Sequence, residues 1–441
     1  MQALSEVTGM NKNLSLKLAP KSKIDGVIKP PGSKSITNRL LLLSSLCNQS
    51  ISLTNHLISD DSKYMIKALE DLGVSISSDT KDKITIFGDP KKFNNSADLF
   101  LGNAGTAYRP LCALLSILGG NYRLDGVERM HERPIKDLVD SLSSIGADIK
   151  YLKNIGFPPV QVSDFKFNGK TDISIKGNIS SQFLTSLLMA VPLIGQDFKL
   201  NIDGELISKP YIDITIKLLK LFNVNYINHN YSSFEFNCND NPKVYSLDSG
   251  LIDIEPDASS ASYFFAAAAI SGNVRVEGLS KESIQGDIQF LEVLEKMGAD
   301  ITYNNDSIDV RKANTLVGGQ FDCIAIPDAA MTLAAMGLFT SSPVELFNIN
   351  SWKVKETDRI VAMENELRKF GATVTSTDNS LKVIPPTNIS DNVSVHTYDD
   401  HRIAMCFSLT CLANKSVEIQ DPECVNKTYP NYFNDFLKLL S

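Results

Sequence analysis

Five short segments of this chain repeat one pattern at a nearly constant spacing. Each closes an amphipathic stretch with Gly or Asn and continues at once into residues typical of a strand: LEDLGVSI, LSSIGADI, LKLFNVNY, LEKMGADI and LRKFGATV. The closing residues stand at positions 73, 146, 223, 298 and 371, so the repeat is 73 to 77 residues long. Gly and Asn tolerate the left-handed backbone that ends many helices. The spacing therefore predicts a series of helix-to-strand junctions, with a sixth such helix at 432–440.

A second set of helices keeps the same spacing. These segments are rich in small residues and apolar on nearly every face, as in SSASYFFAAAAISG, and such a helix must be surrounded by protein. Each repeat then consists of a strand, a buried helix, a strand, a more polar helix and further strands. This order predicts an α/β fold of six units, three in each of two domains, with the boundary near Asp253. The buried helices are expected to begin near Ser33, Gly105, Ser180, Asp257, Asp328 and Asp400.

Composition excludes several classes of protein. A chain of 441 residues is too long for one ordinary core, which agrees with two domains. Its net charge of −8 argues against a nucleic-acid partner. The seven scattered cysteines lack C-x-x-C spacing, which indicates reduced thiols and no metal centre. Because the N-terminus shows no targeting pattern and the apolar helices are too short to cross a bilayer, we expect a cytoplasmic protein without a membrane partner.

The stretch PPGSKSITNRLLLL begins like a phosphate-binding loop. A nucleotide P-loop requires G-x-x-x-x-G-K-[ST], and here only Gly32 precedes Lys34, so the spacing argues against a nucleotide site. A more general anion site remains, because Ser33 can cap the helix and Lys34 adds a positive charge beside its first N–H groups. A capped, buried helix with a solvated lysine explains the same residues without a ligand.

Polar residues gather where strands give way to helix starts, repeat after repeat. If the repeats pack in parallel, these helix N-termini face one way and their dipoles add to the lysines and arginines. The sequence therefore predicts a local cationic site in an acidic protein, suited to a small polyanionic ligand held where two domains meet. The residues in question are Lys34, Ser35, Arg39, Asn103, Thr106, Arg109, Arg133, Ser180, Ser181, Gln182, Ser208, Tyr211, Asp328, Lys355, Glu356, Arg359, His401, Arg402 and Lys427.

Ten motifs in order along the whole chain resemble one family. They are PGSKSITNRLLLL, LGNAGTAYRPL, MHERPIKDLVD, SSQFLTSLLMA, SKPYIDIT, DASSASYFFAAAAI, IPDAAMTLA, WKVKETDRI, DDHRIAMCFSL and DPECVNKTYPNYF, and the family is that of the 5-enolpyruvylshikimate-3-phosphate synthases among the enolpyruvyl transferases. The resemblance implies an inside-out α/β barrel, two domains of three βαβαββ units, and a cleft that closes on substrate. The domains would be 33–253, mainly for shikimate 3-phosphate, and 13–32 plus 254–441, mainly for phosphoenolpyruvate and catalysis.

The family reaction moves the enolpyruvyl group of phosphoenolpyruvate to the 5-hydroxyl of shikimate 3-phosphate and releases phosphate, without a cofactor or metal. By motif, Glu356 is implied to exchange a proton with the methylene carbon, Asp328 to act as base on the hydroxyl, and Lys34 to contact both substrates. For shikimate 3-phosphate the resemblance also implies Ser35, Arg39, Ser180, Ser181, Gln182, Ser208, Tyr211 and Lys355. For phosphoenolpyruvate it implies Gly105, Arg133, Gln182, Lys355, Arg359, Arg402 and Lys427, with Asn103, Thr106 and His401 in support.

Structural roles explain several of these residues equally well. Asp328 can be a helix N-cap, Glu356 a first-turn carboxylate favoured by the helix dipole, and His401 a hydrogen-bonded structural histidine. Arg109 can hold the loop around Gly105. Asp60 and Asp61, which could suggest a metal site, are interpreted as capping or loop-ordering residues.

Two other functions compete with the synthase reading. The sister enzyme that transfers enolpyruvyl to UDP-N-acetylglucosamine carries a reactive cysteine on a mobile loop, whereas Cys112 lies in an apolar helix and is expected to be inert. A non-catalytic phosphometabolite-binding protein would be expected to lose catalytic carboxylates or basic residues, and the principal ones are present.

One position departs from the family pattern. Ser351 stands before the tryptophan where the family usually has asparagine, which puts a shikimate contact in question. Gly105, Thr106 and Pro110 resemble the glyphosate-sensitive form of the family, so glyphosate is expected to compete with phosphoenolpyruvate. The protein is expected to be a monomer.

Overall fold

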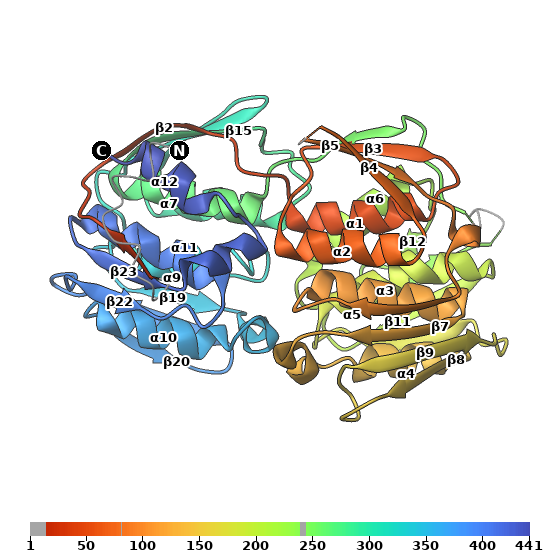
Figure 1. Cartoon of the computed structure of the whole chain (residues 1–441). Helices are drawn as coiled ribbons and strands as arrows, with labels where there is room; N and C mark the ends of the chain where they lie inside the picture. The colour runs from red at the N-terminus through yellow and green to blue at the C-terminus, as the bar shows by residue number, and fades with distance from the viewer. Residues whose placement is uncertain (1–14, 81, 239–243) are drawn as a thin grey trace. The chain divides into compact units, whose positions relative to one another are not determined.

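The computed structural model describes residues 15–80, 82–238 and 244–441, so segment 1–12 before the first expected strand lies outside the described residues. The chain divides into two compact units. The N-terminal unit is Gly32–Ile254, and the C-terminal unit is Glu255–Ser441 together with the described residues before Gly32. In Figure 1 the first runs from orange-red to green and the second from green through cyan to blue, with residues 15–31 in dark red. Among the described residues, no helix is long and apolar enough to cross a membrane.

The N-terminal unit contains three four-stranded sheets in its described residues, one for each predicted repeat. Their strand orders are β14-β3-β5-β4, β6-β7-β9-β8 and β10-β11-β13-β12, and in each the first two strands are parallel and the others antiparallel. The strands are β3 (Ser50–Thr54), β4 (Ser75–Thr80), β5 (Lys83–Phe87), β6 (Ser96–Phe100), β7 (Asn121–Asp125), β8 (Ala147–Tyr151), β9 (Val160–Phe165), β10 (Asp172–Lys176), β11 (Phe198–Asp203), β12 (Ile227–Asn228), β13 (Ser233–Phe236) and β14 (Leu251–Asp253). The last strand, β14, therefore closes the unit by pairing with the first, β3.

The C-terminal unit repeats this plan with sheets ordered β16-β17-β15-β2, β18-β19-β21-β20 and β1-β23-β22. Its strands are β1 (Ser15–Leu18), β2 (Ile24–Ile28), β15 (Gly272–Glu277), β16 (Asp300–Tyr303), β17 (Ser307–Arg311), β18 (Gln320–Asp322), β19 (Val344–Phe347), β20 (Thr373–Ser376), β21 (Ser380–Ile384), β22 (Val393–Val395) and β23 (Val417–Gln420). Strand β2 pairs with β15 in parallel, and β1 pairs with β23 in antiparallel register. Residues 15–31 thus complete two sheets of the distant half of the chain.

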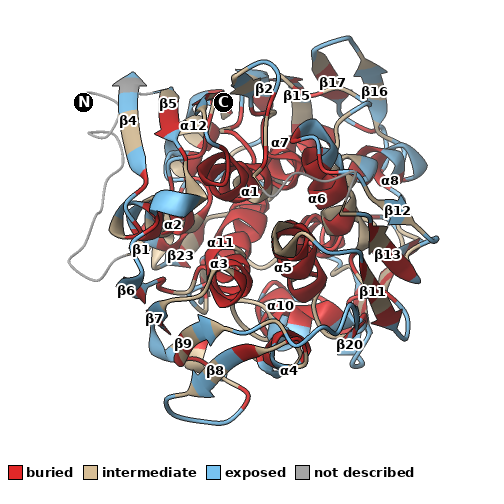
Figure 2. Cartoon of the chain, turned by 90° about the vertical axis from the view of Figure 1, so that its right-hand side faces the viewer, coloured by how far each residue is buried: buried red, intermediate tan, exposed pale blue. Residues whose placement is uncertain are grey.

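An inner helix follows the first strand of each repeat. The inner helices are α1 (Lys34–Ser45), α3 (Gly105–Leu118), α5 (Ser181–Ala190), α7 (Ala258–Ser271), α9 (Ala330–Met336) and α11 (His401–Ser408). Every residue of α7 except Ile270 is buried, and Figure 2 shows the inner helices in the colour of buried residues. The predicted buried helices and their starting points are confirmed.

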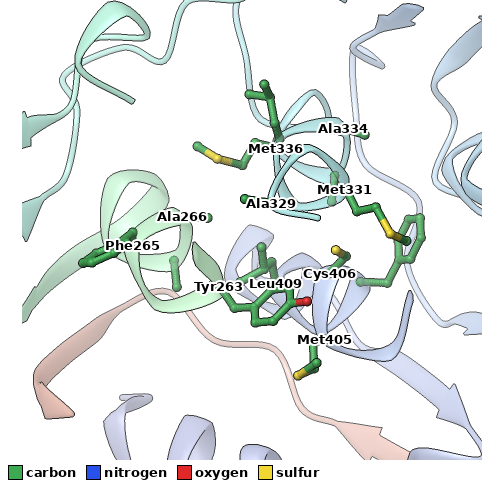
Figure 3. Close-up of a cluster of buried hydrophobic side chains, with 14 of the residues drawn as sticks. Tyr263, Phe265, Ala266, Ala329, Met331, Ala334, Met336, Met405, Cys406 and Leu409 are labelled. Atoms are coloured by element: carbon green, nitrogen blue, oxygen red, sulfur yellow. The ribbon is translucent and has the colours of Figure 1, made fainter. Parts of the chain in front are cut away.

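Small side chains let the inner helices of the C-terminal unit pack closely. Figure 3 shows Tyr263 and Ala266 of α7, Ala334 of α9 and Met405 and Cys406 of α11 gathered in one apolar cluster. Alanine at such contacts allows two helix backbones to approach, while Met fills the irregular gaps between them. This core fixes the three helices relative to one another, and with them the residues at their N-terminal ends.

The outer helices end as the sequence predicts. They are α2 (Asp60–Asp71), α4 (Lys136–Ser143), α6 (Lys209–Leu221), α8 (Phe290–Lys296), α10 (Arg359–Lys369) and α12 (Tyr432–Leu439). The five predicted closing residues all have positive φ, between 57° at Asn223 and 108° at Gly146. Repeats of this kind give the two-domain inside-out α/β architecture, so the predicted fold class is confirmed.

Candidate functional site

In the N-terminal unit, the start of α3 lies beside the N-terminal halves of both α1 and α5. The side-chain amide of Asn38, in the second turn of α1, donates to Thr106 Oγ1 of α3 at 2.7 Å. At Gly105, the first residue of α3, an added Cβ would stand 2.9 Å from Oε1 of Gln182 in α5. The N–H groups that have no partner inside their own helices are therefore concentrated in one region, as the repeat pattern predicts.

Gly105 lies directly beneath two guanidinium groups. An added Cβ would be 2.6 Å from Nη1 of Arg109 and 2.8 Å from Nη2 of Arg133, distances that no ordinary contact allows. Arg133 donates from Nη1 to both the backbone and the side-chain oxygen of Asn103, at 3.0 and 2.9 Å. Arg109 donates to the carbonyl of Pro134 at 3.2 Å, which fits the structural role considered for it. A side chain at this position would have to displace the ends of both arginine side chains.

Lys34 is the first residue of α1, and its Nζ lies 3.5 Å from Oδ2 of Asp61 in the first turn of α2. Asp61 thus pairs with a lysine of the neighbouring helix, and the capping role expected of Asp60 or Asp61 is wrong, because the N-cap of α2 is Ser59. Ser33 occupies the N-cap position, but within the described part of the chain its side chain makes no capping hydrogen bond, so that part of the sequence prediction is wrong. The N–H groups at this helix start are not covered by the serine hydroxyl.

Arg39 is almost entirely engaged by the protein. It donates to Thr215 Oγ1 at 2.8 Å, to the Ser35 carbonyl at 2.8 Å, to the Tyr211 carbonyl at 3.1 Å and to Thr185 at 3.3 Å. Burial lowers the pKa of Arg39 to about 10, against an opposing effect of Tyr211. Four bonds use most of the five donors of a guanidinium, so Arg39 ties α1, α5 and α6 together.

The serines expected at the shikimate side stand at two helix starts. Ser180 is the N-cap of α5, where its hydroxyl accepts from the backbone N–H of Gln182 at 3.3 Å, and Ser181 is the first helical residue. Ser208 precedes α6 with a left-handed φ of 53°, and its carbonyl accepts the N–H of Tyr211. Hydroxyls of this kind can bind the hydroxyl and phosphate groups of a sugar-like ligand.

In the C-terminal unit, two arginines hold Asp328 at the start of the α9 turn. Arg359 donates from Nη1 to Oδ1 at 2.9 Å, and Arg402 donates from Nη2 to Oδ2 at 2.8 Å. The N-cap position of α9 is occupied by Ala329, so the capping role considered for Asp328 is not observed in the described helix. Both carboxylate oxygens are instead oriented by charged donors.

Arg359 contacts three carboxylates although its side chain is only 1% exposed. Besides Asp328, it donates to Glu356 Oε2 at 2.9 Å and to Asp400 Oδ2 at 2.7 Å. Burial by itself disfavours the cation, but the three carboxylates outweigh burial and raise the pKa of Arg359 above its ordinary value. The guanidinium is a fixed positive charge that connects the two carboxylates with proposed catalytic roles.

Two lysines complete the cluster of the C-terminal unit. Lys355 Nζ lies 3.8 Å from Asp328 Oδ1, and Lys427 Nζ lies 3.9 Å from Glu356 Oε1. Burial lowers the pKa of Lys355, with Asp328 opposing that shift. Both distances are longer than a strong hydrogen bond, and both ammonium groups lie beside the carboxylates with proposed catalytic roles.

His401 and Asp400 begin α11. The Asp400 carboxylate accepts the backbone N–H of Arg402 at 2.9 Å as the helix N-cap, and both Asp400 and His401 are fully buried. His401 lies beside Asp400 at the start of this helix, with its Nδ1 3.7 Å from Oδ1 of Asp400, and its supporting role stays a prediction.

Sequence reasoning did not identify three residues that support Asp328. Asp287 accepts the N–H of Ala329 at 3.4 Å and the hydroxyl of Ser259, and burial together with Asp328 raises its pKa to about 6. Trp352 donates from its indole to the Pro327 carbonyl at 2.8 Å, and Tyr263 accepts from Arg402. These contacts span 25 to 139 residues of sequence and leave no local pattern.

Each unit therefore presents cations beside carboxylates or hydroxyls at the N-terminal ends of its inner helices. Such groups can bind phosphate and carboxylate, and Asp328 and Glu356 can exchange protons. No group of three His, Cys, Asp or Glu side chains within the described ranges is arranged to hold a metal ion.

Comparison with known proteins identifies relatives over nearly the full length. The family model described as EPSP synthase (3-phosphoshikimate 1-carboxyvinyltransferase) matches residues 18–436. The 3-phosphoshikimate 1-carboxyvinyltransferase of Neisseria meningitidis is 50% identical over 413 residues, covering 93% of this chain and 94% of its own. That of Shewanella denitrificans is 49% identical over 428 residues, covering 96% and 98%.

Solved structures share the fold at lower identity. The EPSP synthase of Acinetobacter baumannii superimposes with a TM-score of 0.80 at 22% identity, over 97% of this chain and 98% of its own. An enolpyruvyl transferase of Streptomyces tendae gives 0.74 at 14% identity, with the same coverage. At these identities the likeness concerns the fold alone.

Proposed function

The chain belongs to the EPSP synthase (3-phosphoshikimate 1-carboxyvinyltransferase) family, and we propose that it transfers the enolpyruvyl group of phosphoenolpyruvate to the 5-hydroxyl of shikimate 3-phosphate. The products are 5-enolpyruvylshikimate 3-phosphate and inorganic phosphate. The observation that carries the proposal is the pair of carboxylates, Asp328 and Glu356, bound to one buried guanidinium, that of Arg359. Such a pair supplies a base and an acid beside cations for a phosphate-bearing substrate.

In the addition step, protonated Glu356 gives its proton to the methylene carbon of phosphoenolpyruvate. The 5-hydroxyl oxygen bonds to the neighbouring enol carbon, and Asp328 takes the hydroxyl proton. The result is a tetrahedral adduct that still carries phosphate. Arg359 suits electrostatic stabilisation of this step, because its guanidinium remains positively charged while the charges on both carboxylates change.

In the elimination step, the bond between the former enol carbon and the phosphate oxygen breaks. Ionised Glu356 removes a proton from the methyl group, which restores the double bond and the acid for the next turnover. The proton held by Asp328 passes to the departing phosphate. The balance needs neither an oxidant nor a metal.

The binding roles follow the two clusters. We assign shikimate 3-phosphate mainly to domain 33–253, through Ser180, Ser181 and Ser208, and phosphoenolpyruvate mainly to domain 13–32 plus 254–441, through Arg359, Arg402 and Lys427. Gly105, Arg133 and Gln182 are assigned to phosphoenolpyruvate from the first domain. Arginine suits this task because its planar fork matches carboxylate and phosphate oxygens.

The state of Cys112 disfavours the sister reaction with UDP-N-acetylglucosamine. Cys112 is fully buried in α3, and burial raises its pKa to about 12, so its thiol is neither accessible nor ionised. The seven cysteines form no disulfide within the described part of the chain, which supports the proposed cytoplasmic location.

The test is phosphate release from phosphoenolpyruvate by purified protein, without added metal or nucleotide. We expect release with shikimate 3-phosphate and none with UDP-N-acetylglucosamine. Release with only the sugar nucleotide would assign the protein to the sister activity, and no release with either would favour a binding protein.

Glyphosate should raise the apparent KM for phosphoenolpyruvate, because it is expected to compete with that substrate. Light scattering should give the mass of a monomer.

A further inference from the structure

One buried carboxylate of the C-terminal unit lies outside the cluster described above. Glu366 is 0% exposed and follows Arg359 by seven residues on α10, so both side chains lie on one face of that helix. Its Oε1 accepts the hydroxyl of Tyr398 at 2.9 Å, and its Oε2 accepts the backbone N–H of His396 at 3.2 Å. Lys369 Nζ lies 2.7 Å from Oε2 and balances the charge.

The segment that Glu366 holds has an unusual backbone. Tyr398 and Asp399 have φ values of 55° and 54°, two consecutive left-handed residues without a glycine. Side chains other than Gly, Asn and Asp disfavour that region, so this conformation persists only where the surrounding contacts fix it. The next residue, Asp400, starts α11 and accepts both the N–H of Arg402 and the Nε–H of Arg359. Helix α10 thus holds segment 396–400 at both ends, through Glu366 at His396 and through Arg359 at Asp400.

We propose that Glu366 is a positioning residue for phosphoenolpyruvate binding, which acts by fixing segment 396–400 so that Asp400 aligns Arg359 and Arg402. The inference rests on the function proposed above. Burial, and next the bond to Glu366, raise the pKa of Tyr398, so its hydroxyl stays protonated and remains a donor. Because Arg359 and Arg402 also orient Asp328, a shift of the segment moves an anion-binding pair and the proposed base together.

Two substitutions test the contact and one serves as a matched control. Glu366→Gln keeps the shape but removes the charge and one acceptor oxygen, and Tyr398→Phe removes a single hydroxyl. Glu364→Gln makes the same chemical change two residues earlier on α10, where the carboxylate pairs with Arg368 instead of the segment. Steady-state kcat and KM should be measured for both substrates.

We expect both test variants to raise the KM for phosphoenolpyruvate about tenfold, because small displacements of binding groups carry large kinetic penalties. The KM for shikimate 3-phosphate should stay within about twofold, and kcat should fall less than KM rises. The KM of the double variant for phosphoenolpyruvate should exceed that of Glu366→Gln by no more than about twofold, because both substitutions break the same chain of contacts. Glu364→Gln should behave as the unsubstituted protein.

Hydrogen exchange gives a readout that does not depend on turnover. Peptides covering 396–403 should exchange faster in Glu366→Gln and Tyr398→Phe than in Glu364→Gln. Unchanged exchange, or an unchanged KM for phosphoenolpyruvate with only a lower Tm, would overturn the inference. If the unsubstituted protein releases no phosphate, the proposed function fails, and the exchange result alone decides whether Glu366 holds the segment.

Discussion

At the scale of single residues, the candidate site depends on a position without a side chain and on a carboxylate held by two arginines. Gly105 leaves room for Arg109, Arg133 and Gln182, and Asp328 has each oxygen bound by a different arginine. In the proposed reaction these residues have separate roles: the first group binds an anion, and the arginines orient the base.

Gly105→Ala should weaken phosphoenolpyruvate binding. The new methyl group must displace Nη1 of Arg109, Nη2 of Arg133 and Oε1 of Gln182, which lie 2.6 to 2.9 Å from its position. We expect the KM for phosphoenolpyruvate to rise about tenfold or more while that for shikimate 3-phosphate changes little. Gly319→Ala is the control, because its methyl group meets only the Phe321 ring, at 3.2 Å. Equal KM values in the two variants would contradict the placement of the anion pocket.

Asp328→Asn should abolish most of the turnover. The amide keeps the shape of the carboxylate but cannot take a proton, and general bases contribute about 10²- to 10⁴-fold in rate. We expect kcat to fall by about that factor in a protein that still binds shikimate 3-phosphate, measured by phosphate release and calorimetry. A loss below about threefold would remove Asp328 from the role of base.

Asp287 should make the stability of the protein depend on pH. Below about pH 4 the group is protonated in both the folded and the unfolded state, and between about pH 4 and 6 only the folded state keeps the proton. Folded protein binds more protons there, so the free energy of unfolding falls as pH rises through this window. Asp287→Asn lacks this decrease and should gain stability relative to the unsubstituted protein between about pH 4.5 and 7.

Urea unfolding at about pH 4.5 and about pH 7 measures how much more stable Asp287→Asn is than the unsubstituted protein. Asp300→Asn, at a carboxylate with 66% of its side chain exposed, is the control and should show no such gain. A constant difference between Asp287→Asn and the unsubstituted protein across the window would show that folding does not raise the pKa of Asp287.

At this scale the sequence predicted those site residues that stand in motifs shared with the family. Asp328, Glu356 and Arg359 stand in motifs that the family resemblance covers. Asp287 and Glu366 act through bonds that reach 42 and 32 residues along the chain, and nothing in their neighbours distinguishes them from surface acids. The Ser33 cap was predicted from residue type alone, and the hydroxyl does not take that role.

At the scale of helices and strands, local chemistry decides most of the outcome. The closing Gly or Asn of each outer helix takes the left-handed backbone, as predicted, because that preference belongs to the residue itself. Inner helices were recognisable because all their faces are apolar, a pattern that only burial explains. Strand partners were harder to predict, since β14 pairs with β3 some 200 residues earlier.

The inner helices should not accept larger side chains. Ala266 of α7 is fully buried between neighbouring helices, as Figure 3 shows, so Ala266→Leu should lower the free energy of unfolding by about 1–3 kcal/mol. Urea unfolding measures the change. Val361→Leu at the exposed face of α10 should change it by less than about 0.5 kcal/mol. Equal effects would mean that the core has room that the structure does not show.

At the scale of the whole molecule, the two units differ in how they use the chain. The N-terminal unit is one continuous segment, Gly32–Ile254, closed by its own last strand. The C-terminal unit needs residues 15–31, which supply β1 and β2. The sequence repeats predicted three units on each side, and the family resemblance implied that residues 13–32 belong with 254–441, but neither indicated that β1 pairs with β23 and β2 with β15.

A fragment of residues 32–254 should therefore fold alone, whereas residues 255–441 should not. The second fragment lacks the partners of β15 and β23, and unpaired edges favour aggregation. Circular dichroism and urea unfolding should show a cooperative transition only for the first fragment. Joining residues 15–31 to the N-terminus of 255–441 should restore a transition; a fully cooperative 255–441 would contradict this assignment.

The pairing of β2 with β15 and of β1 with β23 also sets an order of events during synthesis on the ribosome. Residues 15–28 are made before their partners at 272–277 and 417–420, and the whole N-terminal unit is synthesised in between. The N-terminal unit can complete its sheets while translation continues, β2 can pair once β15 has been made, and β1 waits for β23. A pause or truncation before residue 417 would leave one finished half attached to an unpaired β1, a form that cellular proteases and chaperones are equipped to recognise.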